Sequence, residues 1–185
     1  MAGIGRRAAA GIILGAIAGA AVPAAAAGPA LPEGITFASI DGGMLSMDDW
    51  RGRPVLVVNT ASLCGFTPQY DDLQALHQRY GPRGLVVLAV PSDDFRQELD
   101  DASAVKDFCE VNFGLTLPMT DITPVKGRNA HPFYRWLAEA HGVEPGWNFN
   151  KVLIGPAGEL LGSWGSMPKP TAPAIVKRIE PFLAG

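Results

Sequence analysis

The stretch VLVVNTASLCGFTPQYDDLQALHQRY, residues 55–80, decides the fold of this chain. Its first seven residues are mostly apolar and rich in β-branched side chains, a pattern typical of a strand buried on both faces of a sheet. Thr67 and Pro68 are typical of the N-cap and first position of a helix, and apolar residues then recur at helical spacing up to Tyr80. One cysteine, Cys64, is therefore expected in the turn between a buried strand and a helix.

The segments on either side complete an α/β pattern. Further strands are predicted at residues 35–40, 44–47, 85–90, 152–154 and 160–164, and further helices at 102–113, 130–140 and 175–183. The turn signal Asp41-Gly42-Gly43 favours a hairpin between the first two strands. This order predicts a thioredoxin-like fold, with a central mixed β-sheet flanked by helices and an N-terminal β-hairpin. The domain is assigned to residues 35–185, and residues 28–34 to a linker.

Composition limits the function. The chain has 185 residues, 48% of them apolar and 18% charged, which suits one globular domain. The net charge is -3 and the body of the chain has no run of basic residues, so we expect no nucleic-acid partner. The two cysteines and three histidines lack the spacing of metal ligands, so neither a metal nor another cofactor is expected.

Residues 1–27 resemble a secretory signal peptide. Arg6 and Arg7 precede an uncharged run at residues 8–22, and residues 24–27 offer a small-residue cleavage site. We therefore expect a protein exported to the periplasm or secreted, with no stable membrane span after cleavage. The alternative is an uncleaved N-terminal segment that anchors the chain in a membrane.

Cys64 is interpreted as a reactive thiol. Unpaired N–H groups at a helix N-terminus favour a thiolate, which is the nucleophilic form. Thioredoxin-type exchange would need a second cysteine at Thr67, and copper delivery would need one at Pro68. A peroxiredoxin would need proline at Val57 and threonine or serine at Ala61. The residues present therefore do not match these three kinds of thiol protein.

Several blocks of the chain resemble the glutathione peroxidase family in its cysteine form. They are NTASLCGFTPQY (59–70), VPSDDF (90–95), DFCEVNFGLTLPMT (107–120), HPFYRWL (131–137) and WNFNKVLI (147–154). The first block is similar to the family's active-site segment, and the third to the segment that bears a resolving cysteine in members that use thioredoxin. The resemblance runs from about Ile35 to Phe182.

The resemblance implies a mechanism. Cys64 would attack a hydroperoxide and become a sulfenic acid, with Trp147 and Asn148 as donors that hold the thiolate and the sulfenic oxygen. Cys109 would resolve the sulfenic acid as a disulfide, which a thioredoxin-like protein or glutathione would reduce. The resemblance therefore points to an antioxidant, thiol-dependent peroxidase acting on hydrogen peroxide and on organic or lipid hydroperoxides.

Two departures from the family pattern matter. Asp94 stands where the resemblance places a loop glutamine, and an ionised carboxylate near Cys64 would oppose formation of a thiolate. We therefore expect that Asp94 is not a donor to the thiol, and Gln97 is the alternative. The segment between His141 and Trp147 is short where larger members insert an oligomerisation loop, which implies a monomer with an open, shallow site.

Two readings from other functional classes stay open at this point. One is a non-catalytic redox sensor or relay, in which oxidised Cys64 passes its disulfide to a partner protein. The other is a thioredoxin-fold binding module in which Cys64 and Cys109 form a structural disulfide, as is common outside the cytosol.

Overall fold

The computed structural model describes Met1 and residues 28–185, so the expected signal peptide lies outside the described residues. A four-stranded sheet has the order β4-β3-β5-β6. Its strands are β3 (Val55–Thr60), β4 (Val86–Pro91), β5 (Lys151–Ile154) and β6 (Leu160–Trp164). β3 and β4 are parallel, whereas β5 is antiparallel to both β3 and β6. The sheet is mixed, and the predicted thioredoxin-like fold is confirmed.

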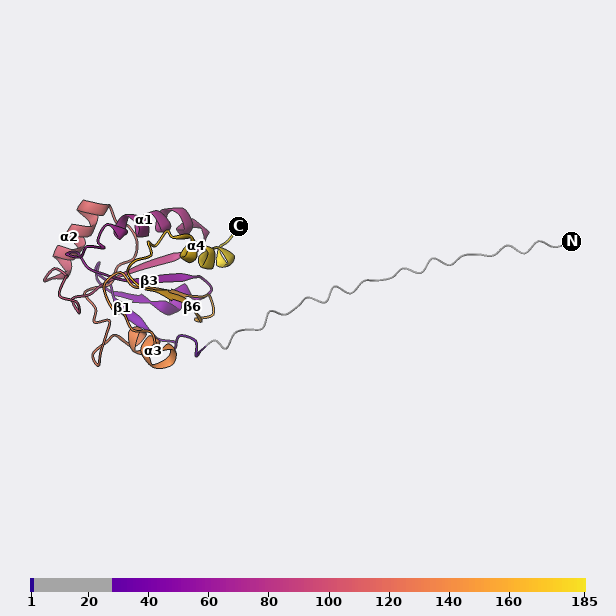
Figure 1. The fold of residues 1–185 in the computed structure, drawn as a ribbon, viewed down its shortest axis with the longest axis horizontal. Helices are drawn as coiled ribbons and strands as arrows, with labels where there is room; N and C mark the ends of the chain where they lie inside the picture. Colours follow the sequence, from indigo (N-terminus) through magenta and orange to yellow (C-terminus); the bar gives the residue numbers. More distant parts are fainter. Residues whose placement is uncertain (2–27) are drawn as a thin grey trace.

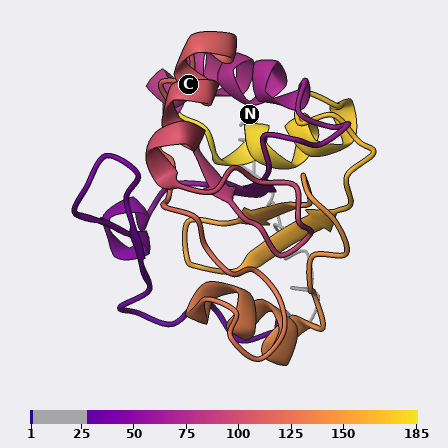
Figure 2. The ribbon, with the colours of Figure 1, turned by 90° about the vertical axis from the view of Figure 1, so that its left-hand side faces the viewer.

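Helices cover both faces of this sheet. One face carries α1 (Gln69–Tyr80), α2 (Ala102–Phe113) and α4 (Pro173–Ile179), and the other carries α3 (Pro132–His141) (Figure 1). Short 3₁₀ turns are η1 (Met47–Trp50), η2 (Gly81–Arg83) and η3 (Glu180–Phe182). The predicted N-terminal hairpin is also present, as β1 (Thr36–Ala38) paired with β2 (Met44–Ser46), and it lies to one side of the main layers (Figure 2).

Strand β3 divides the core in two. Its side chains alternate, so Leu56 and Val58 pack toward α1 and α4 while Val55 and Val57 pack toward α3. All six residues of β3 are buried, as predicted for a strand covered on both faces. The connection from β3 through α1 to the parallel strand β4 is the βαβ unit that presents Cys64 at the end of the central strand.

The segment expected to be a linker packs against the domain. Leu31 is buried, and its N–H donates to the carbonyl of Gly158 at 2.8 Å. The indole N–H of Trp136 on α3 donates to the carbonyl of Pro29 at 3.2 Å. Within residues 28–185, no helix has the length and apolar character needed to cross a membrane.

Candidate active site

Cys64 lies in the turn between β3 and α1 with 8% of its surface exposed. The Phe66 N–H points at Cys64 Sγ from 3.5 Å, and among the described residues it is the one hydrogen-bond donor to that sulfur. The Cys64 N–H donates to the Thr67 hydroxyl oxygen at 3.1 Å, and that hydroxyl lies 2.7 Å from the Cys64 carbonyl oxygen. The turn therefore closes on itself and holds the sulfur just below the surface.

The prediction that Thr67 caps the helix was wrong. α1 begins at Gln69, Pro68 precedes it with helical backbone angles, and the described N-terminus has no side-chain cap. The Thr67 hydroxyl instead contacts carbonyl oxygens inside the turn, including that of Ala61 at 3.0 Å. Thr67 thus stabilises the cysteine turn and not the helix that follows it.

A second segment, residues 97–99, clamps this turn. The Leu63 N–H donates to the Gln97 carbonyl at 2.9 Å, and the Ser62 N–H donates to Glu98 Oε1 at 2.9 Å. The same Glu98 oxygen accepts the N–H of Leu99 at 2.9 Å. Burial raises the pKa of the Glu98 carboxyl above its ordinary value. The sequence reasoning missed Glu98, because an acidic residue in a polar loop carries no sign of being buried.

The side chain of Gln97 meets that of Asn148. Asn148 Nδ2 donates to Gln97 Oε1 at 3.0 Å, and Asn148 is fully buried. The neighbouring Trp147 is 41% exposed and packs on the ring of Phe95, with 5.2 Å between the ring centroids. The structure therefore brings two of the predicted donors, Gln97 and Asn148, into contact and leaves Trp147 at the surface beside them.

Asp94 forms no hydrogen bond with this pair among the described residues and binds the backbone at residues 125–126 instead. Its Oδ2 accepts the N–H of Val125 at 2.6 Å and the N–H of Lys126 at 3.1 Å. A carboxylate held by two backbone donors fixes the loop at residues 125–126. Asp94 therefore has a structural partner of its own, and Gln97 occupies the place next to Asn148.

Cys109 is fully buried on α2, in the apolar cluster that also contains Cys64 and Tyr70. Both cysteines are free thiols. Burial raises the pKa of the Cys109 thiol to about 11, although the nearby Tyr70 hydroxyl lowers it. At neutral pH Cys109 is therefore a protonated thiol with no path to solvent in this conformation.

This buried thiol makes stability depend on pH. The pKa of Cys109 is about 11 when folded against an ordinary value of 9.0, so the unfolded chain loses the proton first as pH rises. The stabilisation is complete below pH 9 and is lost toward pH 11. We expect the free energy of unfolding to fall by roughly 2 to 3 kcal/mol from this group.

Urea unfolding of the wild type and of Cys109→Ala, from about pH 8 to about pH 11, measures this contribution as the difference between the two proteins. Subtraction removes the titration of other groups, such as Lys151, whose pKa burial lowers to about 8. A difference that stays constant across this range would contradict the buried thiol.

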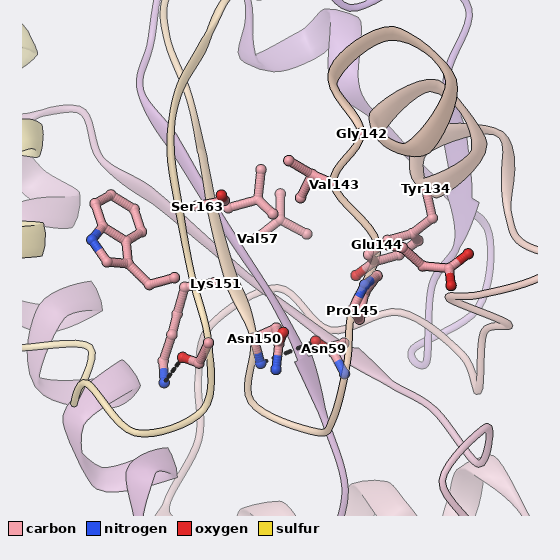
Figure 3. Close-up of a pocket in the computed structure, with 13 residues that line it drawn as sticks. Val57, Asn59, Tyr134, Gly142, Val143, Glu144, Pro145, Asn150, Lys151 and Ser163 are labelled. Atoms are coloured by element: carbon pink, nitrogen blue, oxygen red, sulfur yellow. Dashed lines mark hydrogen bonds between the residues drawn. The ribbon is translucent and has the colours of Figure 1, made fainter.

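The cavity drawn in Figure 3 lies beside strands β3, β5 and β6. It has a volume of about 250 Å³, and its lining includes Val57, Tyr134, Val143 and Asn150 but not Cys64. No group of three or more His, Cys, Asp or Glu side chains within the described part of the chain is placed to hold a metal ion.

Comparison with known proteins identifies the family. The family model described as "Glutathione peroxidase" matches residues 34–138. The hydroperoxy fatty acid reductase of Synechocystis sp. is 40% identical over 148 residues, which cover 74% of this chain and 88% of the relative. A glutathione peroxidase-like peroxiredoxin of Chlamydomonas reinhardtii is 40% identical over 151 residues, covering 78% and 93%.

The fold agrees with this match. The crystal structure of Trgpx in its apo form has 32% sequence identity and a TM-score of 0.58, and the match covers 78% of this chain and 92% of that one. The family model spans more than half of the chain and includes Cys64, Gln97 and Cys109. The chain therefore belongs to the glutathione peroxidase family and is a thiol-dependent peroxidase.

Proposed function

We propose that the protein reduces hydrogen peroxide and organic hydroperoxides, including lipid hydroperoxides, at Cys64, and that Cys109 resolves the oxidised cysteine. The observation that carries this proposal is the position of Cys64 Sγ, which lies just below the surface with the Phe66 N–H directed at it. A thiolate held there by the Phe66 N–H is ready to attack an approaching peroxide. The reductant is a thioredoxin-like protein, with glutathione as the alternative.

The proposed cycle has three steps, which are oxidation of Cys64, formation of a disulfide with Cys109 and reduction of that disulfide. The Cys64 thiolate attacks the distal oxygen of the hydroperoxide, so an S–O bond forms, the O–O bond breaks and the alkoxide leaves as an alcohol after taking a proton. The Cys109 thiol then attacks the sulfenic sulfur, an S–S bond forms, and the sulfenic oxygen leaves as water. Two electrons from a dithiol, or from two molecules of glutathione, restore both thiols.

The surface around the cysteine supports substrates with an apolar chain. Leu63, directly before Cys64, is 60% exposed, and Trp147 presents much of its indole to solvent. Exposed apolar side chains at a site bind apolar groups because contact removes both surfaces from water. The relative from Synechocystis is named a reductase of hydroperoxy fatty acids, which agrees with such a substrate.

A coupled assay tests the proposal. NADPH oxidation is followed with thioredoxin and its reductase, and in parallel with glutathione and its reductase, using hydrogen peroxide and a fatty-acid hydroperoxide. We expect steady-state turnover, faster with thioredoxin, together with a Cys64–Cys109 bridge in non-reducing mass analysis after one equivalent of peroxide. Consumption of a single equivalent with no steady state would instead identify a redox relay.

Asp94 provides a separate prediction. Asp94→Asn is expected to retain peroxidase activity, because the asparagine oxygen can still accept the N–H groups of Val125 and Lys126, which are the partners of the Asp94 carboxylate. The measurement is kcat/KM for hydrogen peroxide, with the unfolding midpoint as the folding control. A fall in kcat/KM of about tenfold or more in a folded variant, about 1.4 kcal/mol of transition-state stabilisation, would make Asp94 a participant in the reaction.

We also propose that the protein is exported after removal of residues 1–27 and acts as a monomer. The N-terminal pattern of basic residues, apolar run and small-residue cleavage site supports export. N-terminal sequencing of the protein from separated cell fractions tests cleavage, and light scattering tests the oligomeric state. Full-length protein in the membrane fraction would favour the anchored alternative.

A further inference from the structure

Ser166, in the loop that follows β6, forms hydrogen bonds with four residues from three parts of the fold. Its hydroxyl donates to the carbonyl oxygen of Asn148 at 2.6 Å and accepts from Asn150 Nδ2 at 3.1 Å. Its carbonyl oxygen accepts from Gln69 Nε2 at 2.7 Å and from Lys151 Nζ at 3.0 Å. One residue thus connects the start of α1, the start of β5 and the backbone of Asn148.

Asn59, near the end of β3, also forms hydrogen bonds with residues 147–150. Its Nδ2 donates to the carbonyl of Trp147 at 3.0 Å. Its Oδ1 accepts the N–H of Asn150 at 3.1 Å, and Figure 3 shows these two asparagines side by side. Its carbonyl oxygen accepts the N–H of Phe149 at 2.6 Å. Every residue from Trp147 to Asn150 is therefore hydrogen-bonded to Asn59, to Ser166 or to both.

These bonds hold a strained backbone. Phe149 has a φ of 59°, in the left-handed region, and its buried ring packs edge-on against Tyr70 with 5.3 Å between centroids. A bulky residue adopts this conformation only where the surrounding contacts enforce it. The conformation places the Phe149 ring in the core while the Asn148 amide turns to Gln97. Loss of a bond that enforces the strain would release the Asn148 side chain from this position.

We propose that Ser166 is a positioning residue for the peroxidase reaction, whose hydroxyl fixes the backbone of Asn148 so that the Asn148 amide stays beside Gln97 and the cysteine turn. The inference rests on the role proposed for Asn148 as a donor at this site. Ser166 is half-buried, and its hydroxyl makes no hydrogen bond to Cys64 or Gln97 in the described residues. Its effect on the reaction therefore passes through Asn148.

The test is a double-mutant cycle on the full chain. Ser166→Ala is expected to lower kcat/KM for hydrogen peroxide by about tenfold, because a displaced donor stabilises the transition state less. In the Asn148→Ala background the same change is expected to have no further effect, since the positioned group is already absent. Ser166→Thr keeps the hydroxyl and is expected to recover most of the activity. Ser163→Ala, an exposed serine on β6, is the matched control and is expected to retain wild-type activity.

The outcomes separate the hypotheses. The unfolding midpoint of each variant is measured, so that a loss of folded protein is not mistaken for a loss of catalysis. Equal fold-losses from Ser166→Ala in the two backgrounds, or no recovery in a folded Ser166→Thr variant, would overturn the positioning role while leaving the peroxidase function intact. Wild-type activity in Asn148→Ala would overturn both the role of Asn148 and this inference, whereas the peroxidase function itself depends on Cys64.

Discussion

Replacing Cys64 with serine is expected to lower peroxide turnover by roughly 10³-fold or more. A serine hydroxyl is not ionised near neutral pH, and it cannot form the sulfenic acid on which the cycle depends. The two side chains are close in size, so the turn held by Thr67 and by residues 97–99 remains intact. The loss is therefore chemical and not structural.

The measurement is peroxide consumption by Cys64→Ser and by the wild type in the presence of the thioredoxin system. An unchanged unfolding midpoint shows that the variant is folded. Loss of Cys64 must also remove the sulfenic acid that a dimedone probe labels in the wild type. Turnover within tenfold of the wild type would place the reacting group elsewhere in the chain.

Cys109→Ala is expected to separate the two halves of the reaction. The first oxidation of Cys64 should proceed within about twofold of the wild-type rate, because Cys109 is buried on α2 and does not contact Cys64 Sγ through any hydrogen bond of the described residues. Steady-state turnover with thioredoxin should fall by roughly a hundredfold, since thioredoxin then has no internal disulfide to reduce. Stopped-flow tryptophan fluorescence follows the first phase, and NADPH oxidation follows the second.

The control is Val111→Ala, an exposed position on the same helix with 83% of its surface accessible. Both phases should be unchanged in that variant. Full steady-state turnover of Cys109→Ala with thioredoxin would show that the reductant attacks the Cys64 sulfenic acid directly.

If the proposed Cys64–Cys109 bridge forms, we expect α2 to open for it. Cys109 has no exposed surface, and its side chain packs in the apolar cluster of α1 and β3. Hydrogen exchange across residues 102–113 is therefore expected to be faster in the disulfide form than in the dithiol form. Equal protection in the two forms would mean that the bridge forms without unwinding of the helix.

The sequence predicts the scaffold well because its signals are local. The apolar run of β3, the helical stripe of α1 and the turn before β2 each depend on neighbours in the chain. The assignment of the N-cap fails at Thr67 because the Cys64 turn competes for the same hydroxyl, and that turn folds into contacts which no short window contains. The residue pair Thr67-Pro68 is typical of a helix N-terminus, and its sequence alone does not distinguish that role from closing the Cys64 turn.

The site is less predictable because distant residues complete it. The contacts from Ser62 to Glu98 and from Asn148 to Ser166 join segments whose pairing is set by the sheet order and not by any local pattern. Asn59 is a feature that could have been recognised from the sequence. A polar residue within an apolar strand is expected to be buried and therefore to need a hydrogen-bond partner. Lys151, fully buried at the start of β5, is a second instance.

An unusual backbone conformation lies between Asp94 and Gln97. Arg96 has a φ of 56°, a conformation that favours glycine, and it reverses the chain between the two side chains. Asp94 is thereby directed to the 125–126 loop and Gln97 to Asn148. Sequence spacing alone leaves the choice between them open, because it does not reveal a left-handed arginine.

If Cys109 resolves the oxidised cysteine as proposed, its burial has a consequence for how the enzyme responds to peroxide concentration. In the proposed cycle, the sulfenic acid on Cys64 has no thiol partner while α2 is closed, and a second hydroperoxide can convert it irreversibly to a sulfinic acid. The fraction of enzyme inactivated in each cycle therefore rises in proportion to peroxide concentration and falls with the rate at which the helix opens. An enzyme that follows this cycle is expected to turn over steadily at low peroxide concentration and to be inactivated by a sudden excess of peroxide.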